Sequence, residues 1–126
     1  MRVLAPLVVM LALLITLGLW TNHSLETTAR GLAREIDSIS AEIEQDRWDK
    51  AVKKTIQLEK LWDQKARWWP IFLEHQEMDN IEFSLARVKE YVASQNRSLS
   101  QGQLSELKLM IEHIPEKEAV TLKNIL

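Results

Sequence analysis

The feature that most constrains this chain is an apolar stretch close to its N-terminus. Residues Val3 to Trp20 read VLAPLVVMLALLITLGLW and carry no charged side chain. As an α-helix, the stretch would be about 27 Å long, close to the hydrocarbon thickness of a bilayer. Its Leu, Val and Ile residues together favour insertion by about 3 to 7 kcal/mol. The sequence therefore predicts that residues 1–21 form a transmembrane helix.

A cleaved signal peptide is the alternative interpretation of this stretch, because the basic residue Arg2 precedes it. The only segment that resembles a cleavage site is Thr27-Thr28-Ala29, about nine residues beyond the apolar stretch. Such a distant site is a poor substrate for cleavage. We therefore expect residues 1–21 to remain attached as a signal anchor.

Charged residues beside the apolar stretch predict its orientation. Arg2 lies on one side, whereas residues 21–29 on the other side contain no Lys or Arg. Basic residues are retained on the cytoplasmic side of a membrane. The N-terminus should therefore be cytoplasmic, with residues 22–126 held outside the cytoplasm at the cell membrane.

The composition of the whole chain excludes several functional classes. Its 126 residues, of which 46% are hydrophobic and 27% charged, allow one soluble domain at most. The formal net charge is -2, and basic residues alternate with acidic ones, which argues against nucleic acid as a partner. The chain has no Cys, so it can form neither a disulfide nor a thiolate metal site. No motif indicates a cofactor.

Beyond the apolar stretch, apolar residues recur at helical spacing. They are separated by three or four positions: Ala29, Leu32, Ile36, Ile39 and Ile43. This pattern predicts an amphipathic helix whose apolar stripe packs against a partner. Because the stripe spans fewer heptads than a coiled coil needs, packing within the same chain is favoured over self-association.

A second amphipathic helix is predicted from Asp46, as its N-cap, to Trp69. Tryptophans share one stripe of this helix: Trp48, Trp62 and Trp69. We expect these indoles to form an aromatic core, because their large apolar area suits the interior of a small domain. Leu61 and Trp68 lie beside the stripe and are predicted either to widen the buried face or to contact a partner.

A third helix is predicted from Ile71 to about Ser94, because Trp69-Pro70 ends the second and Pro is tolerated at a first helical position. Its notable polar residues are His75, Asp79 and Glu82. His75 falls on the apolar stripe of this helix, so it is the most informative of the three. Imidazole and carboxylate groups bind Zn or Fe, which makes these residues a speculative polar or metal site. The alternative is a structural hydrogen bond between His75 and Asp79.

The C-terminal part of the chain predicts two further helices. Ser100 and Gln103 match a capping box ahead of an apolar stripe. Pro115 should end that helix and begin a short last one. The predicted fold is therefore all-α: an N-terminal transmembrane helix, then five soluble segments over residues 22–126. These would form a helical-hairpin bundle or a short repeat-like array.

Several segments along the chain resemble those of a known family. They are Trp48-x2-Ala51, Leu58-x3-Trp62, WWPIFLEHQEMDNI, the tyrosine of VKEYV, and LKNIL. This resemblance to an uncharacterised family found mainly in spore-forming Gram-positive bacteria implies a small single-pass membrane protein without known catalytic residues. The segment from Trp48 to Leu58 is also similar to the second helix of a tetratricopeptide repeat. The first-helix pattern and a period of about 34 residues are missing.

For function, the sequence favours a non-enzymatic, membrane-anchored module for protein interaction or scaffolding. No nucleophile lies beside a base, and no Gly-rich phosphate loop is present. The expected partners are the lipid bilayer and another envelope or membrane protein, and the oligomeric state is left open. The alternative is a small metal-binding or hydrolytic protein that uses His75, Asp79 and Glu82, with tryptophans lining a substrate groove.

Overall fold

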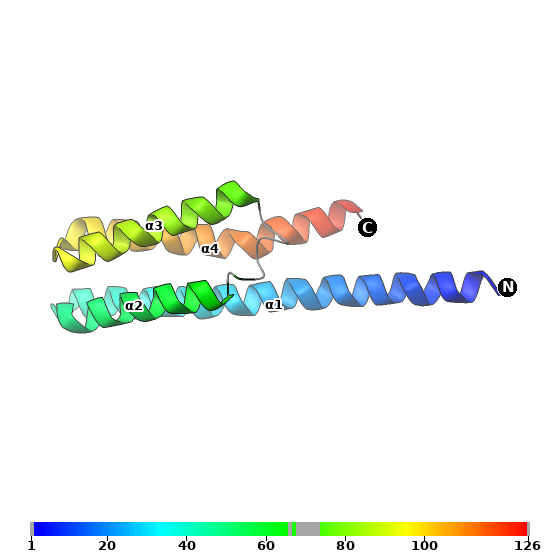
Figure 1. Ribbon diagram of the computed structural model, residues 1–126, viewed down its shortest axis with the longest axis horizontal. Helices are drawn as coiled ribbons and strands as arrows, with labels where there is room; N and C mark the ends of the chain where they lie inside the picture. Colours follow the sequence, from blue (N-terminus) through cyan, green and yellow to red (C-terminus); the bar gives the residue numbers. More distant parts are fainter. Residues whose placement is uncertain (1, 66, 68–73, 126) are drawn as a thin grey trace.

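The computed structural model describes residues 2–65, 67 and 74–125, and the side chains of these residues except Asn22 and 115–125. Within these residues there are four helices, labelled in Figure 1: α1 (Leu4–Glu44), α2 (Trp48–Lys65), α3 (His75–Ala93) and α4 (Arg97–Ile125). No β-strand occurs within these residues. The predicted all-α fold is confirmed for the part of the chain that the structure describes.

The helices pack as an antiparallel bundle. α1 packs against α2 and α4, and α3 packs against the same two helices. Successive helices run in opposite directions (Figure 1). A repeat-like array would keep its first and last helices apart, whereas here α1 contacts α4. The arrangement is therefore an up-and-down four-helix bundle.

α1 joins the apolar stretch to the bundle without a break. The helix runs from Leu4 to Glu44, so the boundary predicted between residues 21 and 22 lies inside it. Residues 21–28 contain neither Gly nor Pro, and so nothing there ends a helix. In Figure 1 the N-terminal end of α1, coloured dark blue, projects beyond the other helices drawn.

One apolar core fills the centre of the bundle. The stripe predicted in residues 29–43 is confirmed, because its members are at most 2% exposed. Further buried members include Leu58 and Trp62 of α2, Ile81, Leu85, Val88 and Val92 of α3, and Leu104, Leu107, Ile111 and Ile114 of α4. The first core residue along α1 is Leu25, so the apolar stretch before it lies outside the core.

The turn between α1 and α2 differs from the prediction. Asp46 has a positive φ of 58°, and its N–H donates to the carbonyl of Ile43. The N–H of Arg47 donates to the carbonyl of Glu42. These two bonds form a Schellman motif, which satisfies carbonyls at a helix end. The prediction of Asp46 as the N-cap of the second helix is wrong, because Asp46 belongs to the end of α1.

The turn between α3 and α4 repeats this geometry. Gln95 has a φ of 57°, and the N–H of Asn96 donates to the carbonyl of Tyr91. The side-chain oxygen of Asn96 then accepts a hydrogen bond from the N–H of Leu99, at 3.0 Å. Asn96 is therefore the N-cap of α4. The predicted capping box is wrong, because Ser100 and Gln103 both lie inside the helix and are buried.

α4 continues through Pro115, where the sequence predicted a break. The prolyl ring removes one backbone N–H from the helical ladder. α4 nevertheless remains helical to Ile125. The prediction of a separate last helix is wrong, since the loss of one hydrogen bond does not end a long helix that packs along α1. The start predicted for the third helix at Ile71 lies outside the described residues.

Candidate functional site

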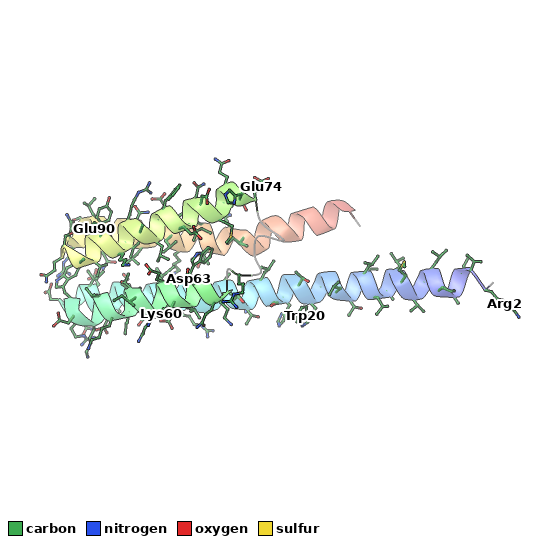
Figure 2. The ribbon with its side chains drawn as sticks, viewed as in Figure 1. Arg2, Trp20, Lys60, Asp63, Glu74 and Glu90 are labelled. Carbon is green, nitrogen blue, oxygen red and sulfur yellow. The ribbon has the colours of Figure 1, made fainter. Side chains whose placement is uncertain are left out.

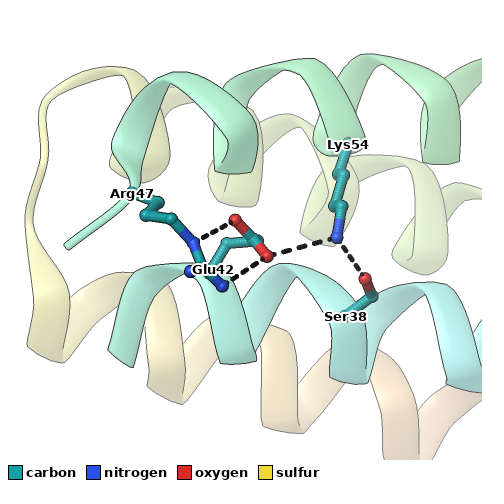
Figure 3. A network of polar contacts seen from close by, with 4 residues as sticks. All are labelled: Ser38, Glu42, Arg47 and Lys54. Carbon is teal, nitrogen blue, oxygen red and sulfur yellow. Dashed lines mark hydrogen bonds and ion pairs between the residues drawn. The ribbon is translucent and has the colours of Figure 1, made fainter. Parts of the chain in front are cut away.

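A buried carboxylate ties α1 to the start of α2. The Arg47 guanidinium donates from Nε to Glu42 Oε2 at 2.9 Å and from Nη2 to Oε1 at 3.1 Å. Lys54 Nζ lies 3.4 Å from Glu42 Oε1 and donates to Ser38 Oγ at 2.7 Å. Figure 3 shows the four side chains together between the two helices. Two cations therefore hold one carboxylate that is only 7% exposed.

The electrostatics of this network keep Glu42 ionised. The hydrogen bond from Arg47 lowers the pKa of the Glu42 carboxyl, burial opposes this shift, and Lys54 adds to it. The same hydrogen bond raises the pKa of Arg47. A carboxylate with a lowered pKa is a poor general acid near neutral pH. The network is therefore suited to fixing the helices and not to proton transfer.

The speculative polar site is not assembled as a ligand set. His75 Nε2 lies 3.5 Å from Asp79 Oδ2, and the His75 side chain is 92% exposed. Its expected place on the apolar stripe is wrong, because the buried face of α3 begins at Met78. Glu82 instead borders a groove against α2. Among the described residues, no group of three His, Cys, Asp or Glu side chains is arranged to hold a metal ion.

The residues predicted for the aromatic core and for partner contacts differ in how deeply they are buried, and the structure describes only some of them. Trp62 is buried, with 2% exposed, and Trp48 is half-buried against the core. Leu61 also packs against the core and is half-buried, so only part of its surface can meet a partner. Trp68 and Trp69 lie outside the described residues. The roles predicted for these two tryptophans stay predictions.

A groove between α2 and α3 is a concave feature of about 590 Å³. It is lined by Glu59, Trp62, Asp63, Glu82, Leu85, Ala86, Lys89, Glu90 and Ala93. Lys89 Nζ lies 3.3 Å from Glu59 Oε2, which forms an ion pair between the two helices. Figure 2 labels Asp63 on α2 and Glu90 on α3, two further carboxylates of the lining. The groove thus combines an indole with a negative border.

Sequence reasoning missed most of this groove. It identified Trp62 and Glu82 but not the acidic residues Glu59, Asp63 and Glu90. The available signal was the spacing of four residues between Glu59 and Asp63, which places both on one side of a helix. That spacing does not tell which helix lies opposite. Only the packing of α2 against α3 brings the two acidic edges together.

A smaller groove of about 330 Å³ lies between α3 and α4. Ile81, Met110 and Ile114 supply its apolar lining, and Glu77, Asn80 and His113 supply polar groups. Neither groove contains a nucleophile paired with a base among its lining residues.

Residues 19–125 match the family described as a domain of unknown function (DUF4363). The chain belongs to this family. No curated protein and no solved structure matches the chain. Membership confirms the predicted resemblance to an uncharacterised family. The single-pass topology and the Gram-positive origin stay predictions, and the family description assigns no activity.

Proposed function

We propose that this DUF4363 protein is a single-pass membrane protein whose helical bundle serves as a non-enzymatic interaction or scaffold module outside the cytoplasm. The observation that carries the proposal is the contrast in burial along α1. Its N-terminal half is long and apolar enough to cross a membrane, and none of that window is buried against the rest of the chain. A bilayer would remove this surface from water.

The exposed side chains of the span are distributed around the whole helix. Leu13, Leu14 and Leu19 are all more than 60% exposed, although they point in three different directions from the axis. A helix that is apolar on every face is stable in lipid and not at a water-exposed surface. Thr16 Oγ1 donates to the carbonyl of Ala12, so even this hydroxyl is satisfied within the helix.

The continuity of α1 supports a direct mechanical link between membrane and bundle. The same helix supplies the span and six of the 18 buried core residues that the structure describes. The two Schellman turns therefore lie at the end of the bundle remote from the span (Figure 1). The positive-inside rule applied to Arg2 places the bundle outside the cytoplasm.

The groove between α2 and α3 is the surface that we assign to a partner. Its lining residues belong to α2 and α3, outside the apolar span of α1, so the groove stays accessible when the span is embedded in lipid. A partner would meet a border with more carboxylates than basic groups. Another envelope or membrane protein with a complementary basic segment fits this surface. Leu61 and Trp68 remain proposed additional contacts.

A topology experiment tests the membrane part of the proposal. A reporter fused after Leu126 should be active only outside the cytoplasm, and the protein should resist carbonate extraction and migrate at its full length. A fusion that is active in the cytoplasm would contradict the orientation. A mature N-terminus near Arg30 would show that the apolar stretch is a cleaved signal peptide.

Site-specific photocrosslinking in native membranes tests the interaction part. A photoreactive residue replaces Ala86 in the groove, and the matched control replaces Phe83, which is exposed on the same helix but outside the groove. We expect a discrete crosslinked product from position 86 only, lost when Glu82→Lys and Glu90→Lys reverse the charge of the border. Equal products at both positions, or insensitivity to charge reversal, would refute the groove as the docking surface.

A further inference from the structure

α4 is longer than the bundle section that it helps to build. α2 ends at Lys65 and α3 begins at His75, and the last described core residue of α4 is Ile114. The helix nevertheless continues to Ile125. Figure 1 shows this C-terminal part, coloured orange to red, running past the start of α3 in the direction of the N-terminal half of α1.

Side-chain contacts between α1 and α4 fix their register. Ser40 Oγ donates to Gln101 Oε1 at 2.5 Å, and Lys108 Nζ lies 3.0 Å from Asp37 Oδ1. Following both antiparallel helices from the Lys108–Asp37 pair by about 17 residues, or about 26 Å, leads to Ile125 on α4 and Trp20 on α1. Figure 2, which labels Trp20, shows α4 reaching this level along the long axis.

The composition of this C-terminal part changes from charged to apolar toward the end of the helix. Residues 115–118 read PEKE and are mostly charged, whereas the following residues AVTLKNI are apolar except for Thr121, Lys123 and Asn124. The charged part follows Ile114, the last described core residue, and the apolar part lies at the level of the end of the span along the long axis. Apolar side chains can enter a lipid interface, and a Lys among them can extend its amine to the headgroups.

We propose that residues 119–125 of α4 lie in the lipid interface beside α1 and form a second contact between the bundle and the bilayer. The proposal rests on the membrane anchoring proposed above. The partner is the lipid surface because this part of α4 reaches the level at which α1 enters the membrane, so the two contacts are continuous. Two contacts with the bilayer fix the tilt of the bundle relative to the membrane, whereas the span of α1 alone leaves this tilt variable.

Single-cysteine labelling of the full chain tests this contact, since the protein has no Cys of its own. An environment-sensitive fluorophore is placed at Leu122→Cys or, independently, Ile125→Cys, in vesicles of phosphatidylethanolamine and phosphatidylglycerol. Leu13→Cys in the span is the positive control. Leu109→Cys, an exposed position on α4 that is 56% exposed, is the negative control. Helix content by circular dichroism confirms that each variant is folded.

The expected result is a blue-shifted emission at positions 122 and 125, with loss of emission when the vesicles contain lipids that carry a nitroxide near the headgroup. The label at position 13 should be shielded from water in the same vesicles, which is seen as blue-shifted emission. The label at position 109 should show neither a blue shift nor quenching. Shielding at position 13 without quenching at 122 and 125 would overturn the second contact and leave the anchor intact. No shielding at position 13 would overturn both. Disulfide formation between unlabelled Ile125→Cys chains on addition of a thiol oxidant, together with no lipid quenching of the labelled chain, would assign this part of α4 to self-association instead.

Discussion

The two halves of α1 have the same backbone conformation and opposite surroundings. In the first half, up to Trp20, apolar side chains cover every face and are exposed. In the second half, from Leu25 to Ile43, apolar side chains recur every three or four residues and are buried against α2 and α4. The pattern of apolar residues, and not helicity, therefore selects the environment of each half.

The halves also differ in what their polar groups do. The first half contains no charged side chain from residue 3 to residue 20. The second half uses its polar face to bind neighbouring helices, through Asp37 with Lys108, Ser40 with Gln101, and Glu42 with Arg47. A buried charge is tolerated there because two cations compensate it. Substitutions in the first half should therefore change membrane insertion, whereas substitutions in the second half should change the free energy of unfolding of the bundle.

The largest effect is expected from a pair of tryptophan substitutions. Trp62→Ala should lower the free energy of unfolding of the bundle by about 3 to 5 kcal/mol, because it leaves a cavity in the core. Trp20→Ala, at a position that is 66% exposed, should leave that free energy unchanged. Urea denaturation in detergent micelles, followed by circular dichroism, measures both. A comparable loss from the two substitutions would mean that the span contributes to the folded core.

A charge in the middle of the span tests the first half by itself. Leu11→Arg should make membrane insertion less favourable by about 2.5 to 3.5 kcal/mol, because the guanidinium must leave water. Carbonate extraction then measures a smaller membrane-bound fraction. Gln57→Arg on the exposed face of α2 is the matched control and should insert like the original chain. Unchanged insertion of the Leu11 variant would contradict the assignment of the first half of α1 to the membrane.

The buried carboxylate gives the second half a pH dependence. The pKa of Glu42 is lowered from its ordinary value of 4.5 by its hydrogen bond to Arg47, so its stabilising effect is fully present above that pH. The effect is lost as the pH falls through the lowered value. Glu42→Gln should therefore unfold at a lower urea concentration at neutral pH, and the difference should disappear in acid. Glu35→Gln on the same helix is the control, and a pH-independent difference for Glu42→Gln would contradict the role of its charge.

The smallest effect is expected from two glycines of α1. A Cβ added at Gly31 meets no atom within 4 Å, so Gly31→Ala should stabilise the bundle by about 0.5 to 1 kcal/mol through helix propensity. Gly18→Ala in the span should not alter unfolding of the bundle, because residue 18 precedes the core. Thermal unfolding of both variants in micelles compares them. Destabilisation by Gly31→Ala would indicate a contact at that position with another molecule.

Elements with strong periodicity could be predicted from the sequence, whereas helix ends could not. The stripe from Ala29 to Ile43 is predictable because a helix that is buried on one face has apolar residues every three or four positions. Asp46 was assigned to the wrong helix end because the same residue type is favoured at an N-cap and tolerated in the left-handed conformation. The choice between these positions depends on the angle at which α2 returns along α1.

Part of the candidate site was predictable for the same reason. Trp62 was expected in the core and is buried there, because a large apolar side chain on a regular stripe has few other places to lie. Spacing alone predicts that His75 lies on a stripe, yet it is exposed because α3 begins at this residue and its buried face begins only at Met78. Periodicity predicts a direction around the helix but not whether a neighbour is present there.

By itself, the sequence determined that the chain is helical, that one apolar stretch is long enough for a membrane, and that a separate amphipathic part must pack on partners. These properties depend on side chains close together along the chain, so residue order contains them. Only the tertiary structure decided that α1 contacts α4, that Glu59 and Glu90 share a groove, and that α4 extends to the level of Trp20. These depend on which helices become neighbours and in what register, because they arise from side chains distant in the sequence that meet only in the packed bundle.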